Sequence, residues 1–179
     1  MRISHALVVI VLLIGFCGCK SVSRGREAAA LLREANDVWA ETNKITDEWM
    51  AEYAKGFGPE QRAQFPFNRA QLKVSAAKII SILDEETRLI NLATVKYEQA
   101  IAMISDEQQR KGMSLFVSSM RKDLEMYKFI QSQTRLASDE SIVDAKTFEE
   151  KFLILGQEIG RVRRESRADL DEGKRLLGM

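Results

Sequence analysis

The sequence predicts an all-α protein, an antiparallel up-down four-helix bundle with long helices. Apolar residues recur three and four positions apart over most of the chain, which is the spacing of one helix face. No stretch combines alternating β-branched residues with the Asn-Gly or Asp-Gly turns of a β-hairpin. Four segments of about 27 to 37 residues, each with a single apolar stripe, can bury those stripes by packing on one another.

The first segment covers Glu27 to Tyr53. Its stripe has the helical spacing and comprises Ala28, Leu31, Ala35, Val38, Thr42, Ile45 and Trp49, widened by Leu32, Trp39 and Tyr53. The helix should end at Gly56-Phe57-Gly58-Pro59, because glycine lacks a side chain to favour the helix and proline cannot continue it.

The second segment starts near Asn68, a plausible N-cap. Its stripe comprises Leu72, Ala76, Ile79, Ile80, Leu83, Thr87, Ile90, Tyr97, Ile101 and Ile104. Ser105 and Gln108 then have the spacing of a capping box, which predicts that a third helix starts at Ser105. Since no glycine or proline separates the two segments, the alternative is one fused rod of about 70 residues.

The third segment continues to Ala137 and is followed by the polar stretch Ser138-Asp139-Glu140-Ser141. Asp144 or Thr147 can cap the last helix. Its apolar positions are Phe148, Phe152, Leu155, Ile159, Val162, Leu170 and Leu177. We therefore expect residues 27–179 to form a single helical-bundle domain, preceded by a linker over 19–26.

The composition of the chain excludes several kinds of chemistry. Its histidine and both cysteines, His5, Cys17 and Cys19, lie in the first nineteen of 179 residues, so the body lacks imidazole and thiol groups. A Ser-His-Asp triad, a structural zinc site and a c-type haem are therefore excluded there. The chain has 27 basic and 26 acidic residues, a balance that does not attract nucleic acid. We expect no enzymatic activity, no metal and no cofactor.

The first 18 residues have the layout of a secretory signal peptide. Arg2 gives a basic start, an apolar run follows from Ala6 to Phe16, and small residues come next. The apolar run is shorter than the about 20 residues that a membrane-spanning helix needs.

The segment Phe16-Cys17-Gly18-Cys19 resembles the lipobox of bacterial lipoproteins. It departs from that pattern at Phe16, where leucine is usual, and at Cys17, where a small residue such as alanine is usual. The resemblance implies a diacylglyceryl group on Cys19 and an acylated amino terminus. Lys20, in place of an aspartate retention signal, then favours the outer membrane, facing the periplasm. The alternative is cleavage after Ser21-Val22-Ser23, which would release a soluble periplasmic protein.

Two further features are candidates for a functional site. Glu86 could be a buried carboxylate. In another register of the same helix, Thr87 lies inside and Glu86 lies at a solvated edge. We expect this second register because it avoids the cost of an unpaired buried charge. The connection from Lys55 to Phe67 contains three phenylalanines, Phe57, Phe65 and Phe67. They either close the end of the core or form an exposed partner-binding site, where a small aromatic cluster can carry most of the binding energy.

Taken together, these features predict a non-enzymatic, membrane-anchored envelope lipoprotein. Its helical bundle would act as a structural or protein-interaction module and would be attached to the membrane through lipid on Cys19. A homo-oligomer is compatible with this prediction. The alternative is a helical-bundle carrier for an apolar small molecule or lipid. That alternative is suggested by the Met- and Phe-rich face of the third helix, with Phe148 and Phe152 opposite.

Overall fold

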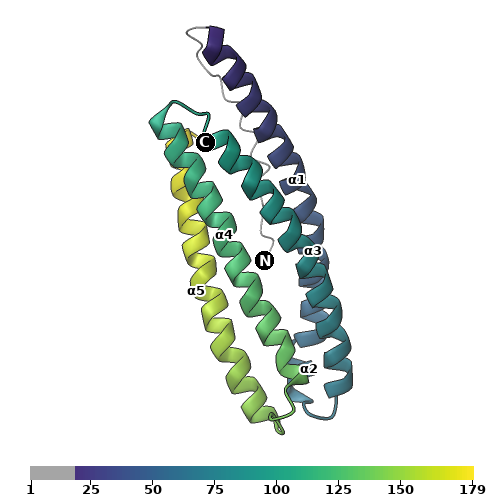
Figure 1. Cartoon of the computed structure of the whole chain (residues 1–179). Helices are drawn as coiled ribbons and strands as arrows, with labels where there is room; N and C mark the ends of the chain where they lie inside the picture. Colours follow the sequence, from purple (N-terminus) through teal and green to yellow (C-terminus); the bar gives the residue numbers. More distant parts are fainter. Residues whose placement is uncertain (1–18) are drawn as a thin grey trace. The chain divides into compact units, whose positions relative to one another are not determined.

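The structure, a computed structural model, describes the backbone of residues 19–179 and the side chains from Arg24 onward. Its helices are α1 (Cys19–Phe57), α2 (Pro59–Ala63), α3 (Arg69–Ile101), α4 (Glu107–Arg135), the 3-10 turn η1 (Leu136–Ser138) and α5 (Ala145–Leu177) (Figure 1). Residues 19–179 contain no strand, which confirms the all-α class and the four long helices. The predicted signal peptide, residues 1–18, lies outside the described residues.

The helices pack as two compact units. Unit 1 contains the described part of Met1–Asn43 together with Arg88–Arg121 and Ser166–Met179, and unit 2 contains Lys44–Thr87 and Lys122–Glu165. Each of the four long helices contributes residues to both units. Within unit 2, α2 connects α1 to α3, and the loop after η1 connects α4 to α5 (Figure 1). Unit 2 is thus built of two helical hairpins.

The helix α1 begins earlier than the sequence predicts. It starts at Cys19, so residues 19–26, which we expected as a linker, are helical. Gly25 costs up to about 1 kcal/mol within a helix. It does not stop α1, because good helix formers follow it and continue the helix. Among the helices of residues 19–179, none has the length and apolar character needed to cross a membrane.

The sequence also did not predict the short helix α2. It begins at Pro59 and follows Gly58, whose extended backbone occupies the N-cap position. Proline suits the first turn of a helix because its fixed φ is already helical and its missing N–H would be unpaired there in any case. The connection between α1 and α3 is therefore partly helical.

A break separates α3 from α4, so the alternative of a fused rod is wrong. The chain leaves the helix over residues 102–106, and α4 begins at Glu107. The residue that caps α4 is Asp106, whose Oδ1 accepts a hydrogen bond from the backbone N–H of Gln109 at 2.7 Å. The break was thus expected at the right place, but the cap lies one residue after Ser105.

We expect Asp106→Ala to lower the free energy of unfolding by about 1 kcal/mol, because it removes the side chain that pairs with a free N–H of the first turn. Ser105→Ala is the matched control, since Ser105 was the cap expected from the sequence. Urea unfolding followed by circular dichroism measures both variants. An equal or larger loss for Ser105→Ala would contradict the observed cap.

The start of α5 agrees with the sequence. Asp144 precedes the helix, and its Oδ1 accepts a hydrogen bond from the backbone N–H of Thr147 at 2.9 Å. Its Oδ2 accepts a second one from the hydroxyl of Thr147 at 2.8 Å. These hydrogen bonds favour the carboxylate and hold the pKa of Asp144 below its usual value. Asp144, rather than Thr147, is therefore the N-cap.

In unit 1, α4 and α5 approach closely at two glycines. A Cβ atom added to Gly112 would lie 2.8 Å from Cγ of Leu177 and 3.2 Å from the carbonyl oxygen of Gly173. Further along the same pair of helices, the hydroxyls of Ser119 and Ser166 are 3.0 Å apart and buried. Small side chains thus permit the two backbones of unit 1 to come together.

Candidate functional site

An aromatic cluster fills the end of unit 2 where the two hairpins turn. It consists of Tyr53 and Phe57 of α1, Phe65 of the connection to α3, and Phe148 and Phe152 of α5. The rings stack, with centroid separations of 4.4 Å for Phe65 and Phe148, 6.0 Å for Phe148 and Phe152, and 6.1 Å for Phe57 and Phe152. Such offset pairs add about 0.5 to 1.5 kcal/mol beyond the burial of their area. The cluster holds α5 against the end of α1.

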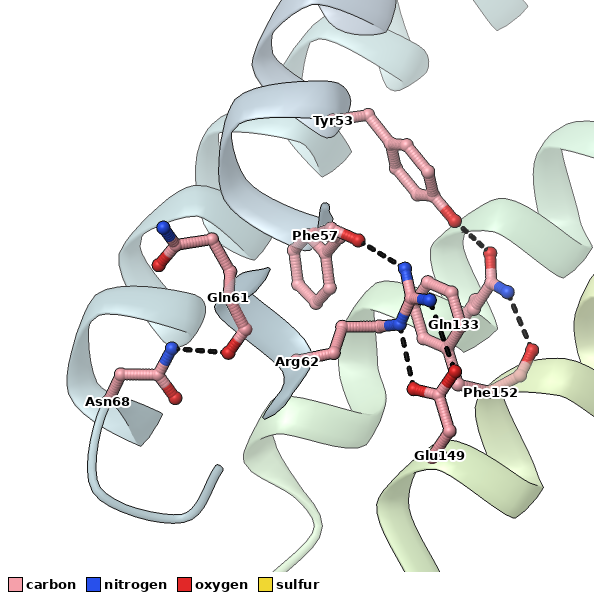
Figure 2. A network of polar contacts seen from close by, with 8 residues as sticks. All are labelled: Tyr53, Phe57, Gln61, Arg62, Asn68, Gln133, Glu149 and Phe152. Carbon is pink, nitrogen blue, oxygen red and sulfur yellow. Dashed lines mark hydrogen bonds and ion pairs between the residues drawn. The ribbon is translucent and has the colours of Figure 1, made fainter. Parts of the chain in front are cut away.

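Arg62 of α2 covers this cluster (Figure 2). Its guanidinium lies 4.3 Å from the centre of the Phe152 ring and donates to the backbone carbonyl of Phe57 at 2.6 Å. Its Nε and Nη2 donate to the two carboxylate oxygens of Glu149 at 2.8 and 3.1 Å. One side chain thus satisfies the carbonyl at the end of α1 and pairs with α5.

Arg69, at the start of α3, connects the two end loops of unit 2. Its guanidinium lies 4.6 Å from the centre of the Phe65 ring. It donates to the backbone carbonyls of Asp139, at 3.4 Å, and Ile142. The loop before α3 and the loop before α5 are therefore joined by one side chain.

The structure separates the three phenylalanines that the sequence singled out. Phe57 and Phe65 are buried and belong to the aromatic cluster, so they close the core and are not available as an exposed partner site. Their burial depends on Phe148 and Phe152, which α5 supplies. Phe67 differs, because 97% of its surface is exposed. Val143, in the loop joined to the same region by Arg69, is 72% exposed.

Glu86 is buried, which corrects the expectation of a solvated edge. Only 1% of its surface is exposed. Most buried side chains of α3 form a stripe with a spacing of three or four positions: Leu72, Ala76, Ile79, Leu83, Glu86, Ile90, Ala93, Tyr97 and Ala100. Leu89 and Thr94 widen it. Glu86 occupies the position of this stripe between Leu83 and Ile90, so the stripe itself was the signal for its burial.

Hydroxyl groups from two neighbouring helices compensate the buried carboxyl group. Thr46 of α1 and Tyr127 of α4 both donate to Oε1 of Glu86, Tyr127 at 2.7 Å. Oε2 of Glu86 and the indole N–H of Trp49 are buried and complete no hydrogen bond of normal geometry. The Trp49 and Tyr127 rings meet edge to face, with centroids 5.9 Å apart. Three helices thus enclose one carboxyl group.

This environment raises the pKa of Glu86. The largest cause is burial, which removes water from the charged form, and the nearby carboxylate of Asp123 acts in the same direction. Interactions with the hydroxyls of Thr46 and Tyr127 and with the indole N–H of Trp49 oppose the shift but do not cancel it. Burial also raises the pKa of Tyr127 well above its ordinary value. Compared with a glutamate in water, Glu86 therefore keeps its proton to a higher pH.

A second buried polar group of unit 2, Gln133 of α4, contacts the aromatic cluster. Gln133 accepts a hydrogen bond from the hydroxyl of Tyr53 and donates to the backbone carbonyl of Phe152 at 2.6 Å (Figure 2). It is buried, and it is not among the candidate residues predicted from the sequence. Its position on the buried face of α4, three residues after Ile130, was the available signal.

The acidic residues of the loop before α5 form a polar connection. Oδ1 of Asp139 accepts hydrogen bonds from the backbone N–H and the hydroxyl of Ser141, at 3.0 and 2.6 Å, and Oδ2 lies 3.4 Å from Nζ of Lys151. Within the described residues, no three histidine, cysteine or carboxylate side chains are placed to hold a metal ion. Cys19 is the first residue of α1, and its side chain lies outside those described.

Comparison of the chain with protein-family models, with curated proteins and with solved structures finds no match. The described features define an all-α protein built of helical hairpins. One end of its unit 2 is closed by aromatic residues and presents an exposed phenylalanine, and a carboxyl group is enclosed in its core.

Proposed function

We propose that the chain is a non-enzymatic lipoprotein of the bacterial envelope whose helical body binds another envelope protein. The observation that carries the proposal is Phe67, a large apolar side chain that is almost fully exposed while its two neighbours in the connection, Phe57 and Phe65, are buried. A single aromatic side chain can act as an anchor when it enters a pocket of a partner. Val143, in the loop that Arg69 joins to the start of α3, is a second exposed apolar side chain.

The backbone on both sides of Phe67 is held in place. The N–H of Phe67 donates to the carbonyl of Gln64 at 2.9 Å, and the N–H of Arg69 donates to the carbonyl of Pro66 at 3.1 Å. The side chain of Asn68 donates to the carbonyl of Gln61 at 2.6 Å (Figure 2). A loop that is ordered before binding loses less conformational entropy when a partner arrives, which favours its use in recognition.

The anchor in this proposal is lipid on Cys19. It is supported by the signal-peptide layout of residues 1–18 and by the resemblance of Phe16-Cys17-Gly18-Cys19 to a lipobox. Several acyl chains, at about 0.8 kcal/mol for each buried CH₂ group, hold a protein on a membrane without a spanning helix. Lys20 after the lipidated cysteine favours the outer membrane, with the helical body in the periplasm.

Metabolic labelling with a radioactive fatty acid tests the anchor. The wild-type protein should carry label and sediment with membranes, whereas Cys19→Ser should be unlabelled. Cys17→Ser is the matched control and should remain labelled. An unlabelled wild-type protein in the soluble fraction would overturn the membrane part of the proposal.

Binding through Phe67 is tested with a photo-crosslinking amino acid introduced at Val143, an exposed position of the loop that Arg69 joins to the start of α3. With Phe67 intact, irradiation of cells should join the protein to one predominant partner. Phe67→Ala should reduce this product about tenfold or more, because a binding anchor contributes at least about 2 kcal/mol. Leu153→Ala is the control, since Leu153 is also exposed but belongs to α5 rather than to an end loop. An unchanged product with Phe67→Ala would remove Phe67 from the proposal.

A further inference from the structure

The carboxyl group of Glu86 is the polar centre of unit 2 and belongs to three helices at once. It projects from α3, and Oε1 accepts hydrogen bonds from Thr46 of α1 and Tyr127 of α4. Trp49 of α1 packs edge to face on Tyr127 beside it. Because a carboxyl group can lose its proton, the group that connects α1, α3 and α4 is also one that can change its charge.

The two charge states of Glu86 place different demands on this site. As a neutral acid, the group leaves no charge in the core. As a carboxylate, it has two hydrogen-bond donors on Oε1, whereas at Oε2 the nearby indole N–H of Trp49 completes no hydrogen bond of normal geometry. An ionised oxygen without water or a donor is costly in a protein interior, and water entry relieves the cost. Ionisation should therefore favour opening of the site.

In the part of the chain that the structure describes, the charged group that shifts the pKa of Glu86 is itself negative. On α4 the titratable groups that face Glu86 are Tyr127 and Asp123, and Asp123 acts on it as a like charge. The side chains that α1 presents to it, Thr46 and Trp49, carry no charge. The α5 cation Arg161 is engaged with Glu125, Glu158 and Glu165.

We propose that Glu86 is a proton-operated latch of unit 2. With the proton bound, it holds α1, α3 and α4 together; when the proton leaves, water enters between these helices at Thr46, Trp49 and Tyr127. The helices themselves persist, so the change is a local opening of their packing. This proposal is independent of the binding role of Phe67, because the two sites share no residue.

Trp49 provides a reporter of this opening, because its indole lies beside Glu86. In a Trp39→Phe background, Trp49 is the remaining tryptophan of the chain. Quenching of its fluorescence by acrylamide, measured between about pH 4 and pH 8, reports how far water reaches the site. The quenching constant should rise several-fold as the pH increases, while the far-ultraviolet circular dichroism stays unchanged.

Two variants separate the latch from general effects of pH. Glu86→Gln keeps the shape of the side chain but cannot ionise, so Trp49 should remain protected at every pH. Glu85→Gln removes the same charge from the adjacent exposed position and should retain the rise. Hydrogen exchange should show faster exchange at high pH at residues around Thr46, Glu86 and Tyr127 in the wild type, and not in Glu86→Gln.

Three results would overturn the proposal. The first is a quenching constant of the Trp39→Phe protein that does not change with pH. The second is an equal rise in Glu86→Gln. The third is a parallel loss of helix content, because it would show that the whole protein unfolds rather than that one site opens.

Discussion

Replacing Phe148 by alanine should lower the free energy of unfolding by about 3 to 5 kcal/mol. The side chain has no exposed surface, and its ring stacks on Phe65 at 4.4 Å and on Phe152 at 6.0 Å. Truncation removes the buried area of a large ring and leaves a cavity among rings that cannot easily collapse into it. Urea unfolding, followed by circular dichroism, measures the change.

Phe67→Ala is the control for this prediction because it deletes the same atoms at an exposed position. It should change the free energy of unfolding by no more than about 0.5 kcal/mol. Phe148 is thus expected to contribute to stability, whereas Phe67 is expected to contribute to binding. Equal costs for the two variants would contradict the assignment of Phe148 to the core and Phe67 to the surface.

Glu86→Gln should make the protein more stable than the wild type at neutral and higher pH. The expected gain in the free energy of unfolding is about 1 to 3 kcal/mol or more, because that is the cost of a buried polar group without a partner. The sign follows from the raised pKa of Glu86. The wild type has its full stability below the ordinary glutamate value of 4.5, and it loses this contribution as the pH rises toward the pKa of the folded state. The advantage of Glu86→Gln should therefore disappear in acid and grow as the pH increases.

The measurement is the free energy of unfolding of both proteins over a series of pH values. Glu85→Gln provides the comparison, since the exposed neighbour should change the pH profile little. A difference between wild type and Glu86→Gln that is independent of pH would show that the pKa of Glu86 is the same in the folded and the unfolded protein. This outcome would count against both the stability prediction and the latch.

The long helices could be predicted because their signal is local. Apolar spacing identified all four, and the break between α3 and α4 lies next to the expected residue, since Asp106 rather than Ser105 pairs with the first turn. The short helix α2 was missed because five residues are too few to show a period. Its local signal was Pro59 after Gly58.

The burial of Glu86 shows where reasoning from sequence fails. The apolar spacing allowed two registers, and the cost of burying a charge favoured the one with Thr87 inside and Glu86 at the edge. The carboxyl group is accommodated by Thr46, forty positions earlier, and Tyr127, forty-one positions later. These partners belong to the tertiary structure, and no pattern within α3 indicates them. A charged residue in the middle of an apolar stripe is thus a reason to search other helices for donors.

The loop phenylalanines were ambiguous for a related reason. Whether Phe57 and Phe65 close the core depends on the rings that α5 supplies, and on Arg62 and Arg69, which cover the cluster. Phe67 has the same residue type and nearly the same position in the sequence as Phe65, yet its side chain is exposed. Composition alone could not separate the three side chains.

The two-hairpin construction of unit 2 also sets an order of events during synthesis. Phe57 and Phe65 belong to the hairpin that leaves the ribosome first, whereas Phe148 and Phe152 follow about 80 to 95 residues later in the chain, which takes several seconds at usual rates of translation. Until then, the rings of the first hairpin lack the stacking partners that α5 supplies. The aromatic end can therefore form only after the start of α5 has been made, and for that interval the growing chain presents an apolar surface that is absent from the finished protein.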